Sequence, residues 1–189
     1  MNSYYDDIEL QSVGFSKIGK NVKISRNARF YQTDGISIGN NVRIDDFCIL
    51  SGKISIGDHV HIAAGVYIFA GDEGVELGDY VGVSSRSVIY ATTDDYSGNA
   101  LTGPTVPMEF RNVIQKKVIL KKHALVGTSV VILPGVTVGE GCAVGSLSLV
   151  NKSLPDWMIC FGSPAKVMSA RSKKIVELEA QYESASSEV

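Results

Sequence analysis

Five side chains stand out as groups that could take a proton from an attacking hydroxyl or amine. They are the three histidines, His59, His61 and His123, and the adjacent carboxylates Asp94 and Asp95. Histidine titrates close to neutral pH, whereas an ordinary aspartate, with a pKa of about 3.9, is a weak base unless burial raises that value. General base catalysis is therefore the chemistry to look for, and the segments that position these residues decide which of them can perform it.

Those segments are built from a six-residue repeat. Units such as IGNNVR (38–43), IGDHVH (56–61) and VGEGCA (138–143) begin with an aliphatic residue and often have Val, Ala or Cys at the fifth place. A helix turns every 3.6 residues and a strand alternates every two, so neither has this period. A short strand that turns a corner every six residues has it, and three such sides close a turn of about eighteen residues. We therefore expect an all-β fold, a parallel β-helix over residues 17–164.

Other stretches do not follow the repeat and are expected to form structures outside the β-helix. Residues 94–117 show no sustained period and are predicted to form an extruded loop, which in a compact domain usually serves function. His123 opens the first turn after this loop, which places it near the mouth of the expected site. Residues 1–16 are a possible acceptor contact, residues 165–182 are predicted to form an amphipathic helix, and residues 183–189 a frayed tail.

Composition excludes several classes of partner. The chain has 189 residues, a formal net charge of −2 and a pI of about 5.9, which gives no electrostatic reason to expect nucleic acid or an anionic membrane. No apolar run approaches the roughly 20 residues of a membrane span, and the first residues lack the pattern of a signal peptide, so a cytoplasmic location is expected. Cys48, Cys142 and Cys160 are few and far apart, so neither a disulfide framework nor a metal site is expected.

The repeat and the segment ICFGSPAKVM (159–168) together resemble the hexapeptide-repeat acyltransferases, and most closely their maltose and galactoside acetyltransferase branch. The resemblance implies a left-handed parallel β-helix. It also implies homotrimers with ligand sites in the clefts between subunits, and transfer of an acetyl group from acetyl-CoA to a sugar without a metal. A cyclic threefold assembly is reasonable, because a heterologous contact that turns by a third of a circle closes on itself.

The position of the family base is altered in this chain. The resembling branch has a histidine after a strand that reads approximately SIYTATHP, and the matching stretch VIYATTDD (88–95) places Asp94 there. The candidate catalytic residues are therefore His123, Asp94 and His61. Because a neutral amine attacks a thioester readily without a strong base, the loss of the histidine adds weight to an amino-sugar acceptor as the alternative to a hydroxyl.

The resemblance also suggests residues for the two substrates. The Thr128 N–H is expected to meet the thioester oxygen, and Ser146, one turn later, to lie beside the pantetheine arm. The remaining candidates for coenzyme A are Lys152, Lys166 and Arg171 as phosphate partners and Pro164 beside the adenine. Asp45, Asp46 and Tyr96 are candidates for the acceptor, because carboxylates bind sugar hydroxyls and aromatic rings stack on sugars.

Three functions follow in order of preference. The main prediction is an acetyl-CoA-dependent O-acetyltransferase acting on a sugar or sugar derivative in surface polysaccharide biosynthesis. The first alternative is an N-acetyltransferase of a nucleotide-linked amino sugar, and the second is a non-catalytic β-helix scaffold. A zinc site like that of the γ-carbonic anhydrases is disfavoured, because such a site needs three zinc-ligating histidines at the subunit interface and this chain has only three histidines in all.

Overall fold

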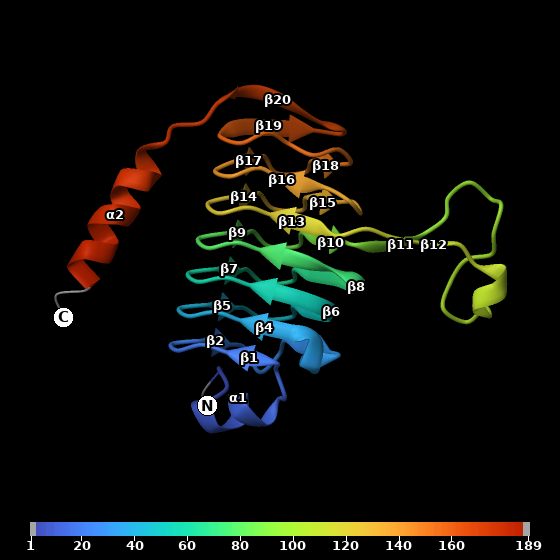
Figure 1. Cartoon of the computed structure of the whole chain (residues 1–189), viewed down its shortest axis with the longest axis horizontal. Coiled ribbons are helices and arrows are strands. Elements are labelled where there is room, and N and C mark those ends of the chain that lie inside the picture. The colour runs from blue at the N-terminus through green and yellow to red at the C-terminus, as the bar shows by residue number, and fades with distance from the viewer. Residues whose placement is uncertain (1–2, 187–189) are drawn as a thin grey trace.

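A computed structural model describes residues 3–186 as a left-handed parallel β-helix, which confirms the expected fold class (Figure 1). The backbone winds as a three-sided solenoid, and each short strand pairs in parallel with the strand one turn later. One three-sided turn is called a rung below, and its sides are called face 1, face 2 and face 3. A long loop leaves the solenoid on one side, and a C-terminal helix lies on the other (Figure 1).

Each face is a ladder of short strands, and the two long strands bend through a corner and so belong to two faces. Face 1 consists of β1 (Lys17–Ile18), β4 (Ile36–Ile38), the second halves of β6 (Ile49–Ile56) and β8 (Tyr67–Leu77), β13 (Val118–Leu120) and β16 (Thr137–Val138). Face 2 consists of β2 (Lys23–Ile24), β5 (Arg43–Ile44), β7 (His61–Ile62), β9 (Gly82–Val83), β14 (Leu125–Val126), β17 (Ala143–Val144) and β19 (Met158–Gly162). Face 3 consists of β3 (Arg29–Tyr31), the first halves of β6 and β8, β10 (Val88–Tyr90), β15 (Val131–Ile132) and β18 (Leu149–Val150).

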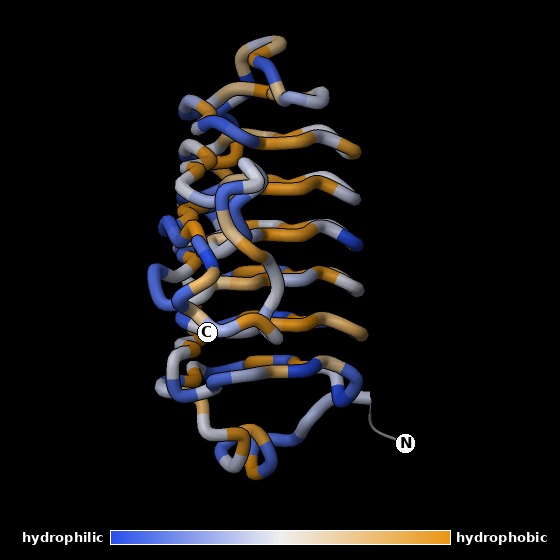
Figure 2. The backbone as a smooth tube through the Cα atoms, turned by 90° about the vertical axis from the view of Figure 1, so that its right-hand side faces the viewer, coloured by the Kyte–Doolittle hydropathy of each residue, from blue (hydrophilic) through white to orange (hydrophobic). Residues whose placement is uncertain are grey.

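The repeat produces the core because equivalent aliphatic residues stack from rung to rung. Ile44 pairs with Ile62 and Ile62 with Val83, and all three side chains are buried. Figure 2 shows the rungs edge-on, with apolar residues recurring at similar places along the solenoid. Because fully burying such a side chain is worth about 1.5–3 kcal/mol, the stack supplies most of the cohesion of the solenoid.

The corner between face 1 and face 2 repeats one backbone conformation. Asn41, His59, Tyr80 and His123 have φ of 56°, 59°, 59° and 60°. A left-handed conformation costs a residue with a side chain roughly 1–2 kcal/mol. Stacking offsets this cost, since the ring centroids of His59 and Tyr80 lie 4.6 Å apart and those of Tyr80 and His123 lie 5.2 Å apart.

The expected loop leaves the corner between face 3 and face 1 on a neck of two strands. β11 (Thr92–Asp94) pairs antiparallel with β12 (Val113–Gln115), and the rest of the loop, which includes the 3₁₀ helix η2 (Met108–Phe110), stands clear of the solenoid (Figure 1). Leu101, Met108 and Phe110 are exposed on it. The shorter turn η1 (Thr33–Gly35) occupies the same corner three rungs earlier.

Both ends of the solenoid are closed. Helix α1 (Asp7–Ser12) covers the first rung with the buried side chain of Leu10. At the other end β20 (Ala165–Ala170) pairs antiparallel with β19. The predicted helix over 165–182 is therefore wrong at its start, because the edge of the last rung takes residues 165–170 as a strand. Helix α2 (Lys174–Ser186) follows and includes residues 183–186, which were expected to fray.

Helix α2 turns back along the solenoid and lies beside the corner between face 1 and face 2 (Figure 1). Among residues 3–186, no helix combines the length and the apolar composition that crossing a membrane requires.

Candidate active site

His123 does not lie at the mouth of a site beside the loop, and that prediction is wrong. Its side chain is 7% exposed under helix α2, and its Nε2 lies 2.8 Å from the Glu179 carboxylate. Lys122 binds the other oxygen of Glu179 at 2.6 Å. The loop begins at the opposite end of face 1 from this corner, so His123 is a structural contact of α2.

Asp94 lies at the neck of the loop, as its place in the sequence suggested. It is the last residue of β11, and its Oδ2 accepts a hydrogen bond from the Gly103 N–H at 3.2 Å. The neck is held to the solenoid by Gln115, whose Oε1 accepts the Asp72 N–H at 3.1 Å. The side chain of Asp94 is half-buried, so a rigid element presents a partly accessible carboxylate next to the solenoid.

Asp95 has a different role from its neighbour. Its carboxylate accepts the N–H and the hydroxyl of Ser97, both at 2.8 Å, and the Asn112 amide at 3.1 Å. These hydrogen bonds, the Ser97 N–H first among them, hold the pKa of Asp95 below its usual value. Asp95 therefore shapes the loop, and Asp94 is the carboxylate of this pair that can face a substrate.

The corner between face 2 and face 3 is made of small residues in the rungs around the loop. Thr128 lies here, and its hydroxyl donates to the Ser85 carbonyl at 2.7 Å, while its N–H has no hydrogen-bond partner among residues 3–186. A Cβ on Gly127 would lie 2.6 Å from the Ser146 nitrogen, so only glycine fits there. The column of Ser84, Gly127 and Gly145 leaves room beside the strands for an extended ligand.

The other residues expected to bind coenzyme A divide into two groups. Lys152, Pro164 and Lys166 are exposed near the C-terminal end of the solenoid, so they stay available to a ligand. Arg171, by contrast, already makes hydrogen bonds within the chain. Its Nη1 donates to the carbonyl oxygens of His123 at 3.1 Å and Gly141 at 2.9 Å, so it fastens the segment before α2 to the solenoid.

The predicted acceptor residues are not brought together. Asp45 pairs with Arg43 at 2.7 Å and with His61 at 2.8 Å, so both of its oxygens already have side-chain partners. Burial opposes ionisation of Asp45, but the hydrogen bonds from His61 and Arg43 outweigh it and lower its pKa. His61 is thus a partner of Asp45, one rung before the rung that carries the loop neck, and its role as a base stays a prediction.

Asp46 and Tyr96 also lie apart from each other. Asp46 accepts the hydroxyl of Ser25 and the Asn27 amide, the latter at 3.3 Å, so it closes the corner of the rung before. Tyr96 is 92% exposed in the loop. Tyr96 follows Asp94 by two residues in the same loop, whereas Asp46 lies two rungs before the rung that carries the neck.

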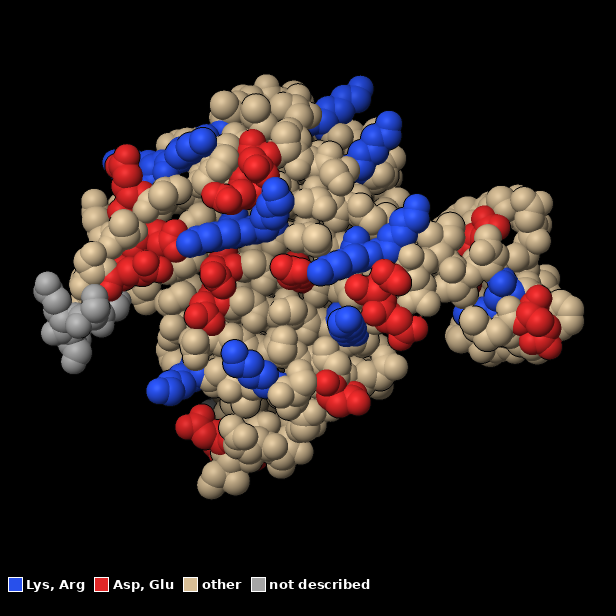
Figure 3. Space-filling view, viewed as in Figure 1, with Lys and Arg blue, Asp and Glu red and all other residues tan. Residues whose placement is uncertain are grey.

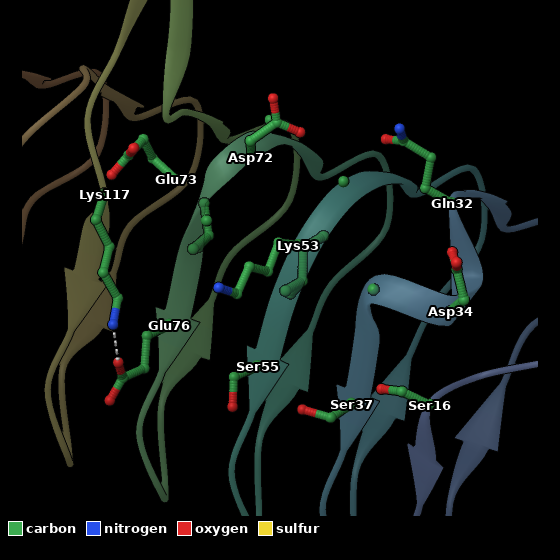
Figure 4. A pocket seen from close by; sticks show the side chains of 16 residues that line it. Ser16, Gln32, Asp34, Ser37, Lys53, Ser55, Asp72, Glu73, Glu76 and Lys117 are labelled. Atoms are coloured by element: carbon green, nitrogen blue, oxygen red, sulfur yellow. Dashed lines mark ion pairs between the residues drawn. The ribbon is translucent and has the colours of Figure 1, made fainter.

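A hollow of about 430 Å³ beside helix α2 is lined by His61, His123 and Arg171, among others. Two further hollows flank the candidate residues on different faces. The larger, about 670 Å³, lies over face 1 below the loop and includes the Lys117–Glu76 ion pair of 2.7 Å (Figure 4). Its charged lining consists of Asp34, Lys53, Asp72, Glu73, Glu76 and Lys117. The smaller, about 220 Å³, lies at the corner between face 2 and face 3 and contains Arg43, Asp45 and Asp46.

Charge elsewhere on the viewed side is mixed, with basic and acidic groups interspersed (Figure 3). Among residues 3–186, no three His, Cys, Asp or Glu side chains gather closely enough to hold a metal ion.

A solenoid of six-residue repeats with an extruded loop is the architecture of a hexapeptide-repeat transferase. Two family models match, "Bacterial transferase hexapeptide (six repeats)" at residues 35–70 and "Hexapeptide repeat of succinyl-transferase" at residues 117–146. The dTDP-4-amino-4,6-dideoxy-D-glucose acyltransferase of Escherichia coli is 45% identical over 183 residues, 95% of each chain. This chain belongs to the hexapeptide-repeat acyltransferases.

Solved structures give the same answer. AntD, an N-acyltransferase from Bacillus cereus in complex with dTDP and 3-hydroxybutyryl-CoA, is 51% identical, with a TM-score of 0.97 over 99% of this chain and 100% of AntD. Other AntD structures contain substitutions at Ser84 or Asp94 of that enzyme, and this chain has serine and aspartate at the same numbers. Galactoside O-acetyltransferase of Lactococcus lactis is 28% identical over 125 residues, 59% of this chain and 60% of that protein.

These relatives confirm an acyltransferase that uses a coenzyme A thioester as co-substrate, and they correct the predicted acceptor. The main prediction, acetylation of a sugar hydroxyl, is contradicted, because the relatives of 45% and 51% identity act on an amino sugar or are N-acyltransferases. They favour the alternative, N-acylation of a nucleotide-linked amino sugar, and they leave the scaffold without support. Ser84, the residue substituted in AntD, was not among the predicted site residues of this chain, because a corner serine is ordinary turn chemistry in a sequence.

Proposed function

We propose that this chain transfers an acyl group from coenzyme A to the amino group of a nucleotide-linked 4-amino sugar. The observation that carries the proposal is Asp94, which stands where the resembling O-acetyltransferase branch has its histidine. A carboxylate is a weak base for an alcohol, whereas an amine needs no strong base before it attacks. AntD, solved with dTDP-4-amino-4,6-dideoxyglucose and coenzyme A as its S84C form, supports the same acceptor class.

The proposed site is shared between copies in a homotrimer. The outward side chains of face 3 include Tyr67, Phe69 and Tyr90, and ring contacts of 6.5 Å and 5.4 Å join them into one aromatic surface. A threefold axis beside face 3 covers this surface, because each copy then faces the other two across it. Asp94 and Ser84 lie at opposite ends of β10 on this face, so Asp94 of one copy meets Ser84 of the next.

The reaction is a direct displacement between the two substrates. The neutral amine attacks the thioester carbonyl, forming the C–N bond and a tetrahedral intermediate with negative charge on oxygen. Its nitrogen is then a strong acid, so the Asp94 carboxylate can take the proton. Collapse of the intermediate breaks the C–S bond and releases coenzyme A and the amide, and the proton passes from Asp94 to the departing thiolate.

Two donors are assigned to the oxygen that becomes negative. The Ser84 hydroxyl and the unpaired Thr128 N–H occupy the same corner of adjacent rungs, and adjacent rungs are about 4.8 Å apart. Donors fixed before reaction stabilise the oxyanion more than water does, since they need no reorganisation. The pantetheine arm continues past Ser146, and Lys152 and Lys166 meet the phosphates near the last rungs.

An acceptor comparison tests the proposal. The purified protein is given coenzyme A thioesters of several chain lengths with dTDP-4-amino-4,6-dideoxyglucose, or with the analogue that has a hydroxyl in place of the amine. Thiol release and mass spectrometry of the sugar product are followed. Amide formation with the amino sugar, at a rate at least about 100-fold above the hydroxyl analogue, is expected. Equal or faster ester formation would overturn the assignment.

A further inference from the structure

We infer that Arg43 and His61, held in place by Asp45, bind the diphosphate of the nucleotide-linked acceptor. This inference rests on the proposed function and assigns the part of the acceptor that the reaction itself does not touch. Arg43 Nε and His61 Nε2 reach the two oxygens of Asp45 at 2.7 Å and 2.8 Å, while about half of each cationic side chain stays exposed. The carboxylate thus orients two donors and leaves their outer faces open.

The remaining hydrogen-bonding capacity suits an oxyanion. A guanidinium carries five N–H donors in a plane, and Asp45 occupies the one on Nε. The Tyr4 ring lies 5.8 Å from the guanidinium carbon of Arg43 and supports its face. When His61 carries both ring protons, Nε2–H stays on Asp45 and Nδ1–H can donate outward. Arginine is the side chain best matched to phosphate oxygens.

The spacing of the rungs places this pair at the right distance from the chemistry. His61 pairs with Gly82 in the rung of Ser84, and Arg43 pairs with His61. At about 4.8 Å per rung, His61 lies roughly 5 Å and Arg43 roughly 10 Å from that rung. Bond lengths near 1.5 Å put the 4-amino nitrogen of such a sugar roughly 6 Å from the nearer phosphorus and roughly 9 Å from the farther one.

The direction in which the acceptor must extend and the open path along the corner also support this site for the diphosphate. Thr128 and Ser146, assigned to coenzyme A, lie on the C-terminal side of Ser84, so the acceptor must extend toward the N-terminal rungs. Between Ser84 and Asp45 the corner is formed by Ala63 and Ala64, whose methyl groups leave the way clear. The hollow of about 220 Å³ lined by Arg43, Asp45 and Ala64 lies at the end of this path.

The larger hollow over face 1 is the competing location, and its charge argues against it. It is lined by four carboxylates and two lysines, and one of these, Lys117, is already paired with Glu76 at 2.7 Å. A diphosphate placed there would face a net negative surface. Lys53 is therefore the lysine whose removal tests this alternative directly.

The experiment measures nucleotide binding by isothermal titration calorimetry with thymidine, dTMP and dTDP as probes. Arg43→Gln and His61→Gln are each expected to weaken dTDP binding at least about tenfold and to leave thymidine binding unchanged. Arg43→Lys keeps the charge without the planar donors and should give a smaller loss. Lys20→Gln, an exposed cation on another corner, is the matched control and should bind dTDP as the wild type does.

Two results would overturn the inference: unchanged dTDP affinity in folded Arg43→Gln and His61→Gln, or a loss confined to Lys53→Gln. Kinetics separate this outcome from failure of the proposed function. If the function holds and the inference fails, the wild type acylates the amino sugar and both variants keep its KM. If the wild type forms no amide yet binds dTDP through Arg43, the anion site stands and the proposed acceptor falls.

Discussion

The imidazole of His123 lies 2.8 Å from the carboxylate of Glu179, and this contact ties helix α2 to the solenoid. Both side chains are less than a tenth exposed. We expect Glu179→Gln to lower the free energy of unfolding by about 2 kcal/mol, because it leaves Lys122 and His123 without their anion. Urea denaturation checks this, with the exposed Glu177→Gln on the same helix as control. Full acylation per folded molecule is expected, and a selective loss of kcat would contradict a structural role.

The same contact predicts an acid-sensitive contribution to stability. Burial opposes ionisation of Glu179, but the hydrogen bonds from Lys122 and His123 outweigh it, so its pKa lies below the usual 4.5. A carboxylate with a lowered folded-state pKa stabilises the fold above its unfolded pKa, and the contribution is lost as pH falls through the folded value. Urea denaturation at several pH values should show a shallower decline below about pH 4.5 for Glu179→Gln than for the wild type. If the stabilities of the wild type and of Glu179→Gln declined in parallel with falling pH, Glu179 would not be the source of the acid-sensitive stability.

Asp94→Asn should abolish proton transfer while keeping the hydrogen bond from the Gly103 N–H, since the amide oxygen still accepts. We expect kcat to fall about 100-fold or more, with the affinity for dTDP and coenzyme A changed less than about threefold. Asp95→Asn is the matched control, because its amide can retain the turn with Ser97. A similar loss of kcat in both variants would point to loop disorder rather than to the Asp94 carboxylate.

The shared site predicts complementation between two inactive proteins. Asp94→Asn and Ser84→Ala chains are unfolded and refolded together in equal amounts. In a trimer where each site combines Asp94 of one copy with Ser84 of the next, about a quarter of the sites receive both intact residues. Activity near a quarter of the wild-type value is expected, against almost none in the separate variants. No recovery in mixed trimers of proven size would mean that each copy supplies both residues.

The solenoid could be predicted because its packing is local. Ile44, Ile62 and Val83 each meet only the residue one rung away, so a six-residue pattern specifies both the strand and its partner. The contact of His123 with Glu179 has no such signal, since 56 residues separate the pair and α2 reaches it only by turning back. The sequence therefore indicated a candidate base where the fold has a helix contact.

The candidate site was partly visible for the same reason. Arg43 and His61 are eighteen residues apart, which is one rung, so the repeat is enough to place them in one column, although only His61 was a candidate and Asp45 was interpreted as a sugar ligand. Asp94 in place of a histidine pointed toward an amine acceptor, but only as the alternative to a hydroxyl. Ser84 could not be singled out from the sequence, because the backbone geometry of a corner is enough to explain a serine there.

The loop that stands away on its two-strand neck has a cost for the unassembled chain. Tyr96, Leu101, Met108 and Phe110 are exposed there, on a segment that a single copy cannot fold back over its own solenoid. In the proposed homotrimer a neighbouring copy can cover such side chains, whereas in a single chain they stay open to non-specific contacts. The melting temperature should accordingly fall as the protein is diluted, because assembly stabilises the folded chain by mass action.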